Sequence, residues 1–86
     1  MEINRRYLDI KDRVFQENPD AKLIDRFEKA LVGLTQNSKP HVAVYDLEKC
    51  ISILIEEGIL INDAMIYLDE ILNSKKEEND PIFISL

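Results

Sequence analysis

A strand-forming run that ends directly at a helix-capping residue is the feature that most restricts how this chain can fold. The run His41-Val42-Ala43-Val44-Tyr45 is rich in β-branched and aromatic residues and follows Pro40. Asp46, which comes next, is a preferred N-cap residue, and Gly58 is a preferred residue just beyond a helix end. A strand that passes without a linker into a helix predicts an α+β domain.

The expected helix between Asp46 and Gly58 carries the widest apolar arc of the chain. Isoleucines would also suit a strand, but the capping residues at both ends favour a helix. We expect this helix to be the central, most buried element. The arc consists of Leu47, Cys50, Ile51, Leu54 and Ile55, with Ile53 beside it.

The first segment is predicted to be an amphipathic helix. Ile3, Tyr7, Ile10 and Val14 recur at gaps of four, three and four residues. We expect this stripe to pack on the chain's own domain. Its spacing also permits a second hypothesis, in which the stripe is the seam of a homodimer.

Two more helices are expected. Asn18-Pro19-Asp20 is a helix-start signal, because Asn caps free amides and Pro suits the first helical position. The helix that follows would place Leu23, Ile24 and Phe27 on one face. The last predicted helix has Asn62 as its cap and Asp63 in its first turn. Its inward residues are expected to be Met65, Leu68, Ile71 and Leu72.

Three short segments are predicted to be strands, near residues 30–35, 41–45 and 81–85. Gly33 could instead end the helix before it, in which case the first strand is lost. We expect about four helices packed on a small antiparallel sheet, with residues 1–86 forming one domain. The alternative architecture is an all-α bundle with extended ends.

Composition excludes several classes of protein. The chain is 45% hydrophobic, too much for disorder throughout. Uninterrupted apolar runs such as Ile53-Leu54-Ile55 are far shorter than the roughly 20 residues of a membrane span. The first residues lack the apolar core of a secretory signal. A single cysteine cannot form an internal disulfide, and it fits a cytoplasmic protein.

Charge is unevenly distributed along the chain. The formal net charge is −6; residues 1–39 carry eight Lys/Arg against seven Asp/Glu, and residues 40–86 carry three against ten. An acidic half is a poor partner for nucleic acid, whose affinity for proteins comes mostly from basic side chains. We expect an acidic surface that docks on a protein. Its candidate residues are Glu56, Glu57, Asp63, Asp69 and Glu70.

Residues for catalysis, metal binding or cofactor binding are scarce. Cys50 is the only thiol and His41 the only imidazole, and they belong to different predicted elements. Two such ligands cannot form a structural zinc site. With only Gly33 and Gly58, no glycine-rich phosphate loop is possible. We therefore expect no enzyme activity, no metal and no cofactor.

The chain from about Lys29 to Ile84 resembles a family of small uncharacterised proteins of bacteriophage and prophage genomes. The resemblance lies in the order and spacing of short segments at 30–33, 42–46, 48–51, 57–58, 63–67 and 81–84. It implies a phage context and supports a hairpin of the first two strands, but it supplies no catalytic residues. Residues 73–80 are charged here, where the family has an aromatic and Asn-rich stretch, so a role of that loop does not carry over.

These observations lead us to expect a non-enzymatic, cytoplasmic protein-interaction module, plausible as a phage accessory protein. One alternative is a small DNA-binding regulator that uses Arg5, Arg6, Lys11 and Arg13 on the first helix. Another is a self-associating structural protein with the first stripe as its seam.

Overall fold

The computed structural model describes residues 5–36, 39–74 and 76–85, with the side chains of Arg5 and Arg6 left out. Along the chain the elements are helix α1 (Arg5–Glu17), the 3-10 helix η1 (Asp25–Ala30), strands β1 (Leu31–Leu34) and β2 (Ala43–Asp46), helices α2 (Leu47–Glu56) and α3 (Ile61–Asn73), and strand β3 (Ile82–Ile84). The α+β class and the positions of all three predicted strands are confirmed.

The sheet is mixed, so the prediction of an antiparallel sheet was wrong in one of its two pairings. Its strand order is β1-β2-β3. β1 pairs with β2 antiparallel, with a bulge between Leu31 and Gly33. β2 pairs with β3 in parallel, and Tyr45 lies opposite Phe83. Because parallel neighbours need a crossover, the chain returns through α2 and α3 to the starting end of the sheet.

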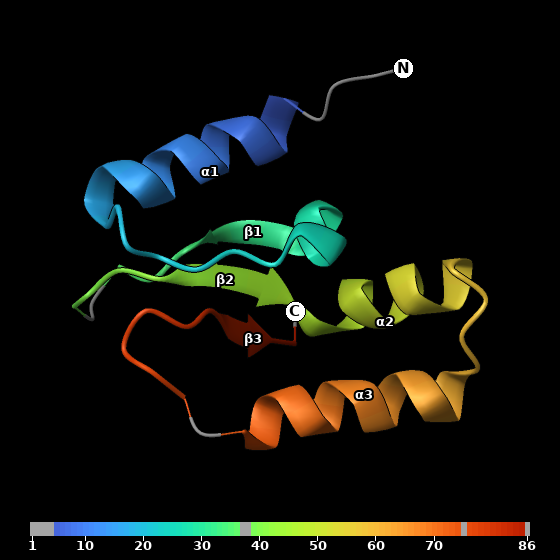
Figure 1. Ribbon diagram of the computed structural model, residues 1–86. Helices are drawn as coiled ribbons and strands as arrows, with labels where there is room; N and C mark the ends of the chain where they lie inside the picture. Colours follow the sequence, from blue (N-terminus) through green and yellow to red (C-terminus); the bar gives the residue numbers. More distant parts are fainter. Residues whose placement is uncertain (1–4, 37–38, 75, 86) are drawn as a thin grey trace.

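The helices lie on different sides of this sheet. Figure 1 shows α1 running alongside β1, whereas α2 continues from the end of β2 and α3 runs back antiparallel to α2. One hydrophobic core joins all of these elements. Its largest fully buried side chains are Tyr45, Phe27, Leu54, Val14 and Cys50.

The α2 helix begins and ends where the sequence predicts. Oδ1 of Asp46 accepts hydrogen bonds from the backbone N–H groups of Glu48 and Lys49, at 3.1 and 3.4 Å. At the other end Gly58 has φ +94°, a left-handed conformation that favours glycine. Its N–H donates to the carbonyl of Ile55, and that of Ile59 donates to Leu54, which completes a Schellman motif.

The helix predicted to start at Pro19 does not form. Residues 21–24 have no regular secondary structure, with Ile24 extended, and the 3-10 helix Asp25–Ala30 that follows is kinked at Phe27. The side chain of Asn18 makes long-range hydrogen bonds: Nδ2 donates to the carbonyl of His41 and to Oδ1 of Asn79, at 2.8 and 2.9 Å. Tertiary contacts thus outweigh the local start signal.

Asn62 is not the cap of α3. The helix starts at Ile61 with Leu60 as N-cap, and no side chain caps it. Met65 was expected to point inward, but it is 53% exposed, whereas Ala64 and Leu68 are buried. The buried side of α3 therefore contains Ala64, Leu68 and the partly buried Ile71; the prediction is confirmed for Leu68 and was wrong for Met65.

Candidate interaction surface

The predicted acidic residues all lie on the α2–α3 hairpin and are exposed. Glu56 is the last residue of α2, Glu57 is its C-cap, and Asp63 lies in the first turn of α3. Asp69 and Glu70 are neighbours further along α3, so they project about 100° apart. The five carboxylates therefore share one hairpin but do not converge on a single point.

Glu57 differs from the other four because an arginine neutralises it. Nη2 and Nε of Arg26 in η1 lie 2.6 and 3.0 Å from Oε1 of Glu57. The hydrogen bond to Glu57 raises the pKa of Arg26. The same guanidinium lies 5.2 Å from the centre of the Tyr67 ring on α3. Arg26 lies thirty-one residues before Glu57 in the sequence. The residues around Glu57, which include no Lys or Arg, therefore gave no indication of this partner.

Large apolar side chains are exposed at the same hairpin, and the sequence analysis missed this feature. Seven such side chains are exposed in the described part of the chain, and only Leu8 and Tyr67 lie outside the following group. We call this group the α2–α3 surface: it consists of Ile55, Leu60, Ile61, Met65 and Ile66, which are 45–73% exposed. The sequence did contain a signal for it: the apolar residues of α3 are spread around the helix, so one buried face cannot cover them all.

Within the α2–α3 surface, two residues form a short row on α3. Ile61 and Met65 are four residues apart, so they lie one above the other on the same side of the helix. Asp69 lies one further turn along this row. Apolar and acidic side chains thus adjoin each other on a solvent-facing side of α3.

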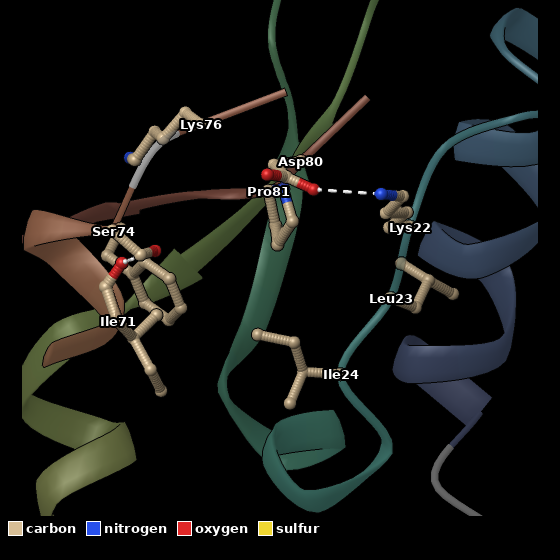
Figure 2. A pocket seen from close by; sticks show the side chains of 9 residues that line it. Lys22, Leu23, Ile24, Ile71, Ser74, Lys76, Asp80 and Pro81 are labelled. Carbon is tan, nitrogen blue, oxygen red and sulfur yellow. Dashed lines mark hydrogen bonds and ion pairs between the residues drawn. The ribbon is translucent and has the colours of Figure 1, made fainter. Parts of the chain in front are cut away.

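A cavity of about 280 Å³ opens on another part of the molecule, between the extended segment, the end of α3 and β3. Figure 2 shows Leu23 and Ile24 on one side and Ile71 and Ser74 on the other. The remaining lining residues are Lys22, Lys76, Asp80, Pro81 and Phe83. The cavity wall is mainly apolar, with charges at its rim.

The rim charges of this cavity largely cancel. Nζ of Lys22 lies 2.8 Å from Oε2 of Glu77 and 3.4 Å from Oδ1 of Asp80. The hydrogen bond to Glu77 raises the pKa of Lys22, and the backbone N–H of Glu77 lowers the pKa of Asp80. A rim of paired charges gives the cavity no preference for a ligand of either sign.

Cys50 and His41 do not form a catalytic pair. Cys50 is fully buried in α2, and burial raises the pKa of its thiol to about 12. His41 lies just before β2, where its Nδ1–H donates to the carbonyl of Thr35 at 2.6 Å. Among the described residues no three His, Cys, Asp or Glu side chains gather closely enough to hold a metal ion. Within the same residues, no helix has the length and apolar character to cross a membrane.

The stripe proposed as a dimer seam belongs mainly to the chain's own core. Tyr7 and Val14 are buried there, and Ile10 packs against them. Ile3 lies outside the described residues. As the chain is folded, Tyr7 and Val14 are not accessible to a second copy, because α1 uses them to cover β1.

The basic residues of α1 form no continuous cationic face in the described part of the helix. Arg13 is exposed, and Nζ of Lys11 lies 5.8 Å from the centre of the Tyr7 ring. Asp9 and Asp12 alternate with these two residues along the helix.

Comparisons with protein-family models, with curated proteins and with solved structures give no match to this chain. The resemblance of residues 29–84 to small phage proteins has no counterpart in these comparisons and stays a prediction. Function is therefore inferred from the surfaces of the chain itself.

Proposed function

We propose that this chain is a non-enzymatic protein-interaction module that binds its partner through the α2–α3 surface. The observation that carries the proposal is the concentration of exposed large apolar side chains between Ile55 and Ile66. Scattered exposed apolar residues are ordinary, but five of the seven exposed large apolar side chains of the described residues belong to this one hairpin, which favours a protein contact there. The resemblance to phage proteins supports a cytoplasmic role as a phage accessory protein.

The surrounding carboxylates suit such a contact. Glu56, Asp63, Asp69 and Glu70 make no ion pair with any described residue, which leaves them available to a partner. Charges around an apolar centre select the partner and accelerate association more than they add affinity. The α2–α3 surface would supply the binding energy, and the carboxylates would supply the choice of partner.

Site-specific photo-cross-linking tests this proposal. A photo-reactive amino acid replaces Met65 in one variant and Leu8, an exposed apolar residue of α1, in a matched control. We expect one discrete adduct from position 65 and none from position 8. The adduct is identified by mass spectrometry, and the purified partner must bind Met65→Gln at least about tenfold more weakly than wild type. Equal adducts at both positions, or equal affinities, would overturn the proposal.

A further inference from the structure

We infer that the α2–α3 surface binds an amphipathic helix whose apolar stripe is flanked by lysines and arginines. The inference rests on the proposed function and adds the chemistry of the partner. Three features of the hairpin support it: the shape of its apolar row, the sign of its charge, and the poor fit of other occupants.

The apolar row on α3 matches the spacing of a helical partner. Ile61 and Met65 lie on one side of α3, and Leu72, which is half-buried, continues this side. From Ile61 to Leu72 this side of the helix runs about 16 Å, or three helical turns, with Asp69 between Met65 and Leu72. A second helix can place its own side chains at i, i+4 and i+7 between these residues.

The charges beside the row are all of one sign. No Lys or Arg occurs between Cys50 and Ser74, and Arg26, which reaches this hairpin from η1, is engaged by Glu57. Asp69 lies one turn beyond Met65 and is exposed, whereas Asp63 and Glu70 project from the opposite side of α3. A partner with Lys or Arg beside its apolar stripe would meet Asp69 and no basic side chain of this hairpin.

The same charges disfavour the other occupants. A second copy of α3 packed along the row would bring a second Asp69 to a surface that already carries one and would supply no basic side chain. The α1 helix of a second copy would have to withdraw Tyr7 and Val14 from its own core. Nucleic acid and anionic lipid surfaces carry negative charge and would be repelled.

Two designed peptides of about 20 residues, long enough to form a helix, test the inference. They share one apolar stripe and differ only at the flanking positions, which are all Lys in one peptide and all Glu in the other. Fluorescence anisotropy with the full chain measures their affinities. We expect the Lys peptide to bind at least about tenfold more tightly than the Glu peptide, and to weaken as salt rises.

Matched variants show whether the contact is at the α2–α3 surface. Met65→Gln should weaken Lys-peptide binding about tenfold, whereas Leu8→Gln should leave it unchanged. Asp69→Lys should also weaken binding of the Lys peptide. Glu78→Lys changes the net charge by the same amount but lies in the loop after α3, so it should leave binding unchanged. Far-UV circular dichroism of each variant verifies that it is folded.

Each contrary result has a defined meaning. Equal binding of the two peptides, or equal effects of Asp69→Lys and Glu78→Lys, would overturn the basic-helix inference. If the cross-linked partner of position 65 is confirmed but the Lys peptide does not bind, this inference fails while the proposed function stands. A dimer that light scattering detects and Met65→Gln dissociates would replace the basic helix by a second copy.

Discussion

The side-chain amide of Asn18 donates a hydrogen bond to the carbonyl oxygen of His41, 2.8 Å away and twenty-three residues further along the chain. This contact joins the end of α1 to the start of β2. The second proton of the same amide donates a hydrogen bond to Oδ1 of Asn79, in the loop before β3. One buried polar side chain therefore connects three distant segments.

Replacing Asn18 should destabilise the fold without changing its surface. Asn18→Ala removes these donors and leaves the carbonyl of His41 without its partner, which should lower the free energy of unfolding by about 1–3 kcal/mol. Urea unfolding followed by circular dichroism measures the change. Asn73→Ala, at the exposed end of α3, is the control and should stay within about 0.5 kcal/mol. Equal effects of the two changes would contradict this role of Asn18.

Tyr45 fixes the extended segment before η1 through its hydroxyl group. The hydroxyl accepts a hydrogen bond from the backbone N–H of Ile24 at 2.8 Å, and the Tyr45 ring stacks on Phe83 at 5.7 Å. Tyr45→Phe keeps the ring but leaves the backbone N–H of Ile24 unpaired, so the free energy of unfolding should fall by about 1–3 kcal/mol. Tyr67→Phe, at a more exposed ring, should have a smaller effect. If the urea midpoint of Tyr45→Phe equals that of the wild type, the Tyr45 hydroxyl does not stabilise the extended segment.

The two cap residues that the sequence predicts should behave differently. Asp46→Ala removes the acceptor for two N–H groups of α2 and should cost about 1 kcal/mol of stability. Asn62 lies inside α3, where Ala has the higher helix propensity, so Asn62→Ala should be neutral or slightly stabilising. Thermal unfolding of both variants provides the comparison. A loss in Asn62→Ala as large as in Asp46→Ala would show that Asn62 caps the helix in solution.

The two glycines offer a similar contrast. At Gly58 φ is +94°, so Gly58→Ala should lower stability by about 1–2 kcal/mol. Gly33 has no positive φ, and a Cβ built there would meet no atom within 4 Å. Gly33→Ala should therefore be neutral or stabilise the protein by up to about 1 kcal/mol. The urea midpoint of Gly58→Ala should therefore lie below that of the wild type, whereas the midpoint of Gly33→Ala should equal or exceed it.

Cys50 should be unreactive until the chain unfolds. Burial raises its thiol pKa to about 12 and that of the Tyr45 hydroxyl to about 12. Native protein should resist iodoacetamide at about pH 8, whereas protein in concentrated guanidinium should be alkylated. Because both pKa values are higher in the folded state than in the unfolded state, the contribution of these two groups to stability should be fully present below about pH 8 and should be lost as pH rises towards 12. Rapid labelling of native protein would contradict the buried placement of Cys50.

Local signals in the sequence predicted the parts of the fold that depend on local chemistry. Asp46 and Gly58 bound α2 because capping and positive φ are properties of single residues. The segment after Asn18 was wrongly predicted because its hydrogen-bond partners, His41, Asn79 and Tyr45, are remote in the sequence. The direction of β3 relative to β2 depends on how α2 and α3 pack, which no local pattern records.

The candidate site was predictable only in part. The absence of Lys and Arg between Cys50 and Ser74 pointed to the α2–α3 hairpin, and its carboxylates are exposed there. The apolar half of the surface was missed because Met65 was assigned to the core, whereas its neighbour Ala64 is the residue that is buried. The Arg26–Glu57 ion pair joins distant parts of the chain and left no signal at either position.

The parallel pairing of β2 with β3 has an energetic consequence for any partner of this protein. The crossover from Leu47 to Pro81 connects these two strands, so the hairpin that would bind the partner lies between them along the chain and shares one core with them. A ligand that binds only the ordered hairpin would stabilise the whole sheet by mass action, by about 2.7 kcal/mol at a concentration one hundred times its Kd. Occupancy of the α2–α3 surface and resistance of the entire chain to unfolding are thereby thermodynamically linked.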